Sequence, residues 1–230
     1  MRDMHCHIVP GVDDGARTMA ESLAMLDAAV QAGVTEIVCT PHCRRPYFDF
    51  DAMQESFAAF AAQARRRYPH VPVSMGFEVN LSTLRHIGFD WAAHLGFEKA
   101  RAPQGLELGA TVHEFLLELP VKAAAYEYAD IQRDIFALQG RGYEVIIAHP
   151  ERYEAIQEDI SIAQQLVDMG CKLQASAEFV AGGRLGTSKR PAIRMMKEGL
   201  YSYIASDAHS TEHYKFLAKA CKKYSRFLRG

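Results

Sequence analysis

Short runs of apolar and β-branched residues alternate with helical stretches about seven times along this chain of 230 residues. After most of these runs the apolar side chains recur every three to four residues, a period typical of an amphipathic helix. Repeated strand–helix units favour a parallel sheet, and seven units in one chain of this length favour a sheet closed into a barrel related to the TIM fold. The runs expected to form strands are residues 1–7, 36–40, 71–79, 115–119, 145–149, 172–176 and 201–206.

Local signals indicate where helices begin and end. Thr18 and Glu21 have the spacing of a capping box, so a helix is expected to start there and to stop near Gly33. Asp51 with Gln54 is expected to open the next helix, which would run to about residue 68. Three more glycines stand where later helices would end, each just ahead of an expected strand: Gly140, Gly170 and Gly199.

Residues 83–113 fit this pattern less well, because Gly88, Gly96, Pro103 and Gly105 interrupt it. We expect an excursion with one or two short helices there, and its role stays open. The sequence contains no low-complexity tract and no strong linker. Residues 1–230 are therefore predicted to form a single domain.

Composition excludes several classes of protein. The formal net charge of −2 argues against a general nucleic-acid binder, which would carry a basic excess. The sequence lacks a run of about 18 apolar residues, so membrane insertion is not expected. The five cysteines are an odd number without paired spacing, which favours reduced thiols and a cytoplasmic enzyme. The oligomeric state is not indicated.

The polar residues fall at or near the C-terminal ends of six expected strands, where barrels of this kind place their active sites. The pair at positions 5 and 7 points two imidazoles to one face of a strand, a spacing suited to one metal ion. Glu118 stands between Leu117 and Leu119, where burying a carboxylate without a cation or partner is costly. The recurrent residues are His5, His7, His42, Glu78, Glu118, His149, Asp207 and His209.

This set of side chains predicts a metal centre. Imidazoles and carboxylates without cysteine suit Mn²⁺, Fe²⁺ or Zn²⁺. The set exceeds what one ion needs, so two or three ions are expected. Sites with several metal ions are well suited to phosphoryl transfer, because they activate water and neutralise the charge of the phosphate oxygens.

Three motifs resemble one known family. The stretch HCHIVPGVDDG at residues 5–15 resembles the pattern HxHxxPGxDDG that opens the CpsB/CapC-like enzymes, which are PHP-type tyrosine phosphatases encoded with bacterial capsule and exopolysaccharide genes. AHPERY at 148–153 and SDAHS at 206–210 match two further motifs of that family, and TPH at 40–42 falls in the expected order. The resemblance spans nearly the whole chain.

The resemblance implies a distorted (β/α)7 TIM-like barrel of the PHP type with three metal ions, commonly Mn²⁺. It implies hydrolysis of phosphotyrosine on a protein, with a bacterial tyrosine kinase as the suggested partner. Asp13 and Asp14 are adjacent, and the motif favours Asp14 as the ligand, leaving Asp13 to brace the loop. The implied ligands are His5, His7, Asp14, His42, Glu78, Glu118, His149, Asp207 and His209.

Other residues are expected to contact the substrate. Arg152 matches the active-site arginine of the family, and a guanidinium can grip phosphate oxygens with two prongs. Asp207 or His209, acting through water, is a candidate to protonate the leaving group. Arg44 and Arg45 follow a predicted ligand and are candidates for substrate binding.

Alternatives remain open from the sequence. They are a small-molecule phosphatase of the PHP type, acting on histidinol phosphate or a nucleotide, an amidohydrolase, and an inactive metal-binding regulatory module. The sequence also departs from the family pattern at Cys43, at Phe77 and over residues 174–179. These departures remove no predicted ligand, but they bear on the preferred substrate.

Overall fold

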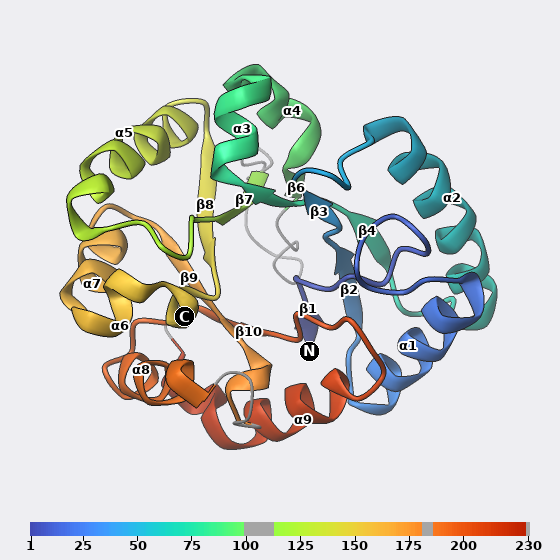
Figure 1. The fold of residues 1–230 in the computed structure, drawn as a ribbon. Helices are drawn as coiled ribbons and strands as arrows, with labels where there is room; N and C mark the ends of the chain where they lie inside the picture. Colours follow the sequence, from blue (N-terminus) through green and yellow to red (C-terminus); the bar gives the residue numbers. More distant parts are fainter. Residues whose placement is uncertain (99–112, 181–185, 229–230) are drawn as a thin grey trace, which may run out of the picture.

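The computed structural model describes residues 1–98, 113–180 and 186–228. Parallel strands stand around a central axis, and the helices form an outer ring around them (Figure 1). Each strand lies parallel to its neighbours, except β6, which pairs with β7 in the antiparallel sense. The strands are β1 (Arg2–Asp3), β2 (Glu36–Cys39), β3 (His42–Cys43), β4 (Val73–Met75), β5 (Glu78–Asn80), β6 (Phe97–Glu98), β7 (His113–Glu118), β8 (Tyr143–Ala148), β9 (Lys172–Ser176) and β10 (Tyr203–Ala205).

Two sheets join to close the wall of the barrel. One has the order β1-β2-β4, and the other runs β10-β9-β8-β7-β5-β3. The strands β2 and β3 are separated by only two residues, and so are β4 and β5. Each pair therefore forms one continuous section of the barrel wall, which we call a stave. A parallel bridge between Cys6 and Ala208 joins the β1 and β10 staves, with His7 N–H donating to Ala208 O at 2.9 Å. The described strands therefore close a distorted (β/α)7 barrel, and the predicted fold class is confirmed.

The helices differ in detail from the expectation. Thr18 caps α1 by accepting from Glu21 N–H, but the Glu21 carboxylate accepts from Arg17 N–H and so does not complete the capping box. Asp49 caps α2, whereas Asp51 lies inside its first turn, so the predicted start was two residues late. The α-helices are α1 (Met19–Gln31), α2 (Phe50–Arg67), α3 (Leu81–Ile87), α4 (Ala92–Leu95), α5 (Tyr128–Gln139), α6 (Glu154–Glu158), α7 (Ser161–Asp168), α8 (Gly186–Lys197) and α9 (His213–Tyr224).

Short 3₁₀ turns complete the described chain. After α3 the excursion continues through a 3₁₀ turn and α4 to β6, which agrees with the expected short helices; the expectation for residues 99–112 lies outside the described residues. None of the described helices combines the length and apolar character needed to cross a membrane. The 3₁₀ turns are η1 (Phe89–Trp91), η2 (Ala125–Glu127), η3 (Pro150–Arg152), η4 (Ala177–Val180) and η6 (Ser225–Phe227).

Two buried cores hold the barrel together, one on each face of its wall. Along β8, Val145 and Ile147 belong to the large core under the helices, whereas Ile146 and Ala148 belong to a separate small core. Because alternate residues of a strand face opposite sides, the small core fills the barrel interior. It underlies the end of the barrel at which the polar residues gather.

Candidate metal centre

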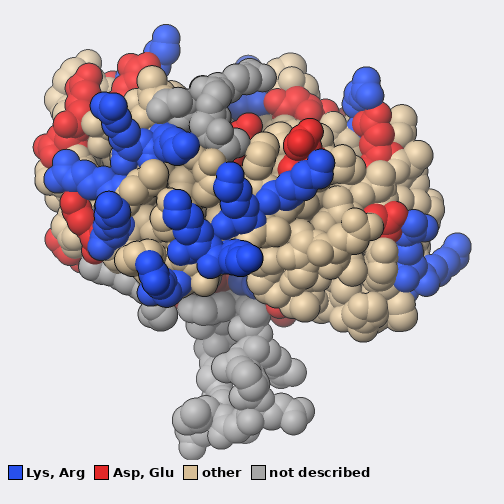
Figure 2. Space-filling view, turned by 90° about the horizontal axis from the view of Figure 1, so that it is seen from below, with Lys and Arg blue, Asp and Glu red and all other residues tan. Residues whose placement is uncertain are grey.

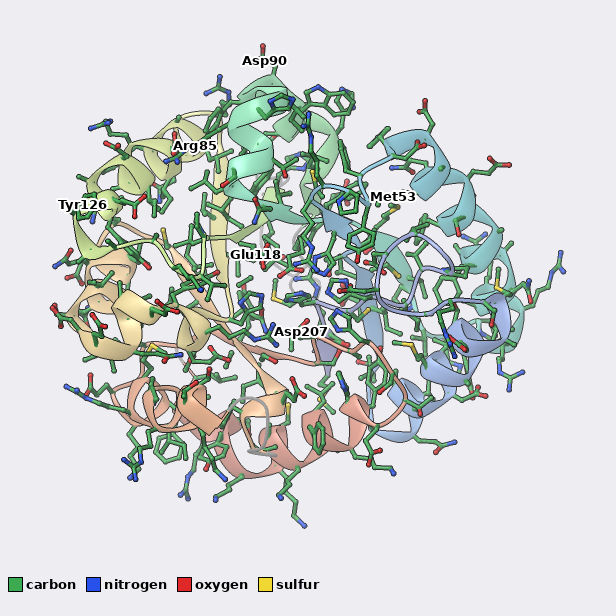
Figure 3. The ribbon with its side chains drawn as sticks, in the orientation of Figure 1. Met53, Arg85, Asp90, Glu118, Tyr126 and Asp207 are labelled. Carbon is green, nitrogen blue, oxygen red and sulfur yellow. The ribbon has the colours of Figure 1, made fainter. Side chains whose placement is uncertain are left out.

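The nine side chains predicted as metal ligands gather at the C-terminal ends of the strands. Eight come from the strands or from the four residues after them, and Asp14 comes from the loop that follows His7. Figure 3 shows the labelled Glu118 and Asp207 near the barrel axis, among many other polar side chains. The potential ligand atoms form four overlapping groups, and within each group they lie within 4.8 Å of one another. The groups are His7/Asp14/His42/His209, His5/His149/Asp207, His5/His7/Glu78 and Glu78/Glu118/His149.

Glu78 lies at the middle of this arrangement. Its side chain is 1% exposed, and imidazole nitrogens of His5, His7 and His42 lie 3.5, 3.4 and 2.7 Å from its Oε2. Among the described residues this oxygen nevertheless makes no hydrogen bond of acceptable geometry. Glu78 Oε1 hydrogen-bonds with His149 Nε2 at 2.7 Å, whereas the nitrogens that converge on Oε2 suit a shared cation, so the residues fit a metal ion.

Contacts outside the centre fix the orientation of two of the predicted ligand histidines. Gln174 Oε1 lies 2.9 Å from His5 Nδ1, and Asp13 Oδ2 lies 2.8 Å from His7 Nδ1. If each Nδ1 carries the proton, the Nε2 atoms of both rings remain free to face the centre, where they lie 3.2 Å apart. A contact of this kind usually raises the basicity of a metal-ligating imidazole.

The loop after β1 is braced by one aspartate and presents the other. Asp13 is buried and also accepts from the N–H groups of Gly15 at 2.9 Å and His42 at 3.1 Å. Asp14 is 42% exposed, and its Oδ1 lies 3.1 Å from His42 Nε2. Asp13 therefore braces the loop as expected, and Asp14 as a metal ligand stays a prediction.

Electrostatics in the cluster favour ionised carboxylates and protonated histidines. Burial would raise the pKa of Glu78, but His5, His149 and His42 lower it well below the usual range. Burial would lower the pKa of His5, yet the nearby carboxylates of Glu78 and Asp207 raise it to about 9. Binding of a cation would therefore displace protons from these imidazoles.

Arg152 lies on η3, directly after His149, with its guanidinium at the edge of the cluster. Its Nη2 donates to Asp207 Oδ2 and to Ser176 Oγ at 3.3 Å, and Glu178 Oε2 lies 3.8 Å away. Its Nε is buried and has no hydrogen-bond partner among the described residues. This N–H is thus available to an anion.

The rest of the AHPERY motif holds this turn in place. The Tyr153 hydroxyl donates to Ala148 O at 2.6 Å and accepts from Leu119 N–H at 3.0 Å. Glu151 is fully buried and accepts from Ser176 N–H and from the Tyr201 hydroxyl, each at 2.8 Å. These contacts connect β7, β8 and β9 beneath the arginine.

Comparison with known proteins decides the family. A family described as "Capsular polysaccharide synthesis, CpsB/CapC" matches residues 1–226. The chain belongs to the CpsB/CapC family. It is 30% identical to the tyrosine-protein phosphatase YwqE of Bacillus subtilis over 94% of this chain and 80% of that protein. It is 27% identical to the tyrosine-protein phosphatase CpsB of Streptococcus agalactiae over 96% of this chain and 88% of that protein.

Solved structures agree with this assignment. A structure from a study of YwqE from Bacillus subtilis and CpsB from Streptococcus pneumoniae, described there as metal-dependent tyrosine phosphatases, superposes with a TM-score of 0.74 at 28% identity. It covers 99% of this chain and 89% of the other. A β-aspartyl dipeptidase from Fervidobacterium islandicum superposes with a TM-score of 0.53 at 12% identity, over 97% of this chain and 68% of that one. That likeness concerns the fold alone.

The two arginines after the TPH motif of this CpsB/CapC protein lie in different places. Arg44 Nη2 is 3.0 Å from Asp14 Oδ2, and its Nη1 is 4.0 Å from Glu118 Oε1, so Arg44 borders the cluster. Arg45 instead donates to His86 Nε2 on α3. The structure brings Arg44 to the centre and directs Arg45 away from it.

Several residues of the site went unrecognised in the sequence. Gln174 and Ser176 lay in a segment noted only for departing from the family pattern, although polar residues two apart on a buried strand could have indicated an inward face. Asn80 donates to Glu118 Oε2 at 2.9 Å, and His213 Nδ1 accepts from His209 N–H at 3.3 Å. Neither residue had a sequence signal that linked it to the site.

Proposed function

We propose that this chain is a metal-dependent tyrosine-protein phosphatase that serves capsular polysaccharide synthesis. The observation that carries the proposal is the convergence of buried ligand atoms on Glu78 Oε2, which lacks a hydrogen bond among the described residues. The named activities of YwqE and CpsB supply the substrate class.

The nine predicted ligands would hold two or three divalent ions, with Mn²⁺ as our first choice and Fe²⁺ or Zn²⁺ as alternatives. Bound ions would supply Lewis acidity that activates water and neutralises phosphate charge. The protein contributes by fixing the geometry: Gln174 and Asp13 orient His5 and His7 before the ions arrive.

Two arginines flank the place where a phosphate would bind. Arg152 offers its unpartnered Nε–H, and release of Nη2 from Asp207 would allow a two-pronged grip on phosphate oxygens. Arg44 lies toward Asp14 and Glu118 and could contact another oxygen. Both cations would oppose the charge that develops in the transition state.

Departure of the phenolate calls for a proton donor close to the opening of the site. His209 is partly exposed, and its Nε2 lies 3.3 Å from Asp14 Oδ1. Burial would lower the pKa of His209, but Asp14 and Asp207 raise it, and the ring would lose this proton on binding a metal ion. We therefore assign proton donation to a water beside His209 or Asp207.

An aromatic side chain and a hollow would receive the rest of the substrate. Tyr47 is 37% exposed and stacks on His42 with ring centroids 6.3 Å apart, so it offers a face to the phenyl ring of phosphotyrosine. A pocket of about 560 Å³ beside the centre, whose lining includes Asp14, His209 and Thr211, leaves room for the flanking peptide. A bacterial tyrosine kinase as the substrate protein, and a cytoplasmic location, stay predictions.

The proposal is tested by initial rates on a phosphotyrosine peptide, a phosphoserine peptide of the same sequence and histidinol phosphate. Protein loaded with Mn²⁺ is compared with protein kept in chelator. We expect turnover of the phosphotyrosine peptide alone, abolished by the chelator. Preference for histidinol phosphate would show that the enzyme is a small-molecule phosphatase. Turnover that persists in chelator would refute the metal-dependent mechanism.

A further inference from the structure

Two neighbouring helices on the flank of the barrel each carry a stripe of basic residues. On α8 the stripe is Arg190, Arg194 and Lys197, and on α9 it is Lys215, Lys219 and Lys222. Both stripes have the spacing i, i+4, i+7, which places their members on one side of a helix. All six residues are exposed, whereas the other sides of the helices bury residues such as Met195 and Leu217.

The charge of the chain is unevenly distributed. Residues 186–228 contain nine of the 26 Lys and Arg but only three of the 28 Asp and Glu. One of those three is Asp207, which lies in the metal centre. A chain with a net charge of −2 thus has a positive C-terminal part and an acidic remainder. We call the surface formed by α8 and α9 the α8/α9 face. Figure 2 shows the Lys and Arg gathered over it, with few acidic residues among them.

Most of these cations lack an anionic partner. Arg194 pairs with Glu198 at 2.9 Å and Lys215 with Glu212 at 3.6 Å, both on the exposed surface. Among the described residues, no carboxylate lies within ion-pair distance of the other basic side chains of the face. Those side chains are Lys189, Arg190, Lys197, Lys219, Lys222, Lys223 and Arg226.

The α8 stripe also borders a hollow of about 370 Å³. Its lining combines the cationic Arg190, Arg194 and Lys197 with the apolar Ile193, and Glu198 is the acidic member. A hollow with cations around an apolar wall matches the headgroup of an anionic phospholipid, whose phosphate adjoins a glycerol backbone. The lining contains no aromatic ring on which a nucleic-acid base could stack.

The face is separate from the opening of the metal centre. In Figure 1 the view runs along the barrel, and α8 and α9 lie on the outer ring, whereas the labelled Glu118 and Asp207 of Figure 3 lie near the axis. A surface that contacts this flank would leave the strand ends accessible. Six of the nine cations are lysines, whose compact hydrated charge suits diffuse attraction to a charged plane.

We propose that the α8/α9 face binds the anionic headgroups of a lipid bilayer, so that the protein adsorbs to the surface without inserting. Each basic residue close to an anionic surface strengthens binding roughly five-fold, and salt weakens the attraction. The inference rests on the charge and position of these helices and does not depend on the phosphatase activity.

Co-sedimentation of the full chain with vesicles tests this proposal. We expect binding to vesicles that mix phosphatidylcholine with phosphatidylglycerol, no binding to phosphatidylcholine alone, and release by added salt. The double variant Lys219→Gln/Lys222→Gln should bind roughly twenty-five-fold more weakly. Its circular dichroism and its hydrolysis of a soluble aryl phosphate should match those of the wild type.

A matched control removes two charges elsewhere. Arg65 and Arg66 end α2, on another part of the ring (Figure 1); both are exposed, and no ion pair to them occurs among the described residues. Arg65→Gln/Arg66→Gln should bind the anionic vesicles like the wild type. Equal weakening by both double variants, or binding that ignores lipid charge, would overturn the proposal. Tighter binding to duplex DNA than to the vesicles, lost in the α9 variant, would overturn it in favour of nucleic acid.

Discussion

Arg152 contacts a predicted metal ligand and has an N–H group left for a phosphate. Its Nη2 donates to Asp207 Oδ2; burial would raise the pKa of Asp207, but the guanidinium and His5 lower it well below the usual range. A phosphate entering the site would compete for the same guanidinium. An arginine, whose planar group has several donors, therefore suits this position better than a lysine, whose charge is a single point.

Arg152→Lys is expected to lower kcat/KM for a phosphotyrosine peptide about a hundred-fold, because an ammonium cannot replace the two-pronged grip. Metal content, measured on the purified variant, should remain that of the wild type. Arg133→Lys, an exposed substitution on α5, serves as the control. Undiminished kcat/KM in Arg152→Lys would remove the arginine from the mechanism.

Cys43 follows the predicted ligand His42 but is not expected to act as a nucleophile. It is fully buried, and burial raises the pKa of its thiol to about 12, so the reactive thiolate is scarce near neutral pH. Cys43→Ser should therefore keep kcat within about two-fold of the wild type, as measured on the same peptide. An inactive Cys43→Ser protein that still holds its metals would contradict a purely metal-based mechanism.

At the scale of elements, the loop between β1 and α1 is tightly constrained. It brings Asp14 beside the predicted ligands His42 and His209 and passes close to the backbone of His7. A Cβ on Gly15 would lie 2.0 Å from His7 O, a distance that no side chain can occupy without backbone movement. A glycine is therefore required at this point of the PGxDDG motif.

Gly15→Ala is expected to displace the loop and with it Asp13, which orients His7. Titration should show a weaker affinity for Mn²⁺, by ten-fold or more, in line with the cost of losing an outer contact to a ligand histidine, about 10–100-fold. Gly140→Ala is the control, because Gly140 has a helical φ of −62° and ends α5 away from the centre. Wild-type affinity in Gly15→Ala would show that the loop tolerates the displacement.

At the scale of the whole molecule, the two ends of the sequence meet in one wall. The β1 and β10 staves are joined near Cys6 and Ala208, and the predicted metal ligands come from both staves as well as from those between them. Neither half can complete the barrel or the centre without the other. This supports the prediction that residues 1–230 form one domain.

One cooperative thermal transition is therefore expected in calorimetry, and Mn²⁺ should raise its midpoint. At an Mn²⁺ concentration about 100 times Kd, the added stability is about 2.7 kcal/mol. The pKa of His5 is about 9 and that of His42 about 10 in the metal-free protein, so both rings must lose protons before they can bind metal. The stability added by Mn²⁺ should consequently increase from about pH 6 to about pH 8. Two separate transitions, or a gain independent of pH, would contradict these expectations.

The sequence by itself determined the barrel and the identity of the polar cluster. Periodicity located the strands to within a few residues, and in a parallel barrel all strands point the same way, so a residue at a C-terminal end necessarily lies at the end where the others gather. That is why His5, Glu78, His149 and Asp207 could be placed together before any contact was known.

The tertiary structure alone decided the contacts that orient these residues. Gln174 reaches His5, and Arg152 reaches Asp207 and Ser176, across strands distant in sequence, so these contacts depend on register and side-chain direction. The split of the 71–79 run into two strands and the divergence of Arg44 from Arg45 have the same origin. Local patterns set what each segment forms, whereas only packing in three dimensions sets which side chains meet.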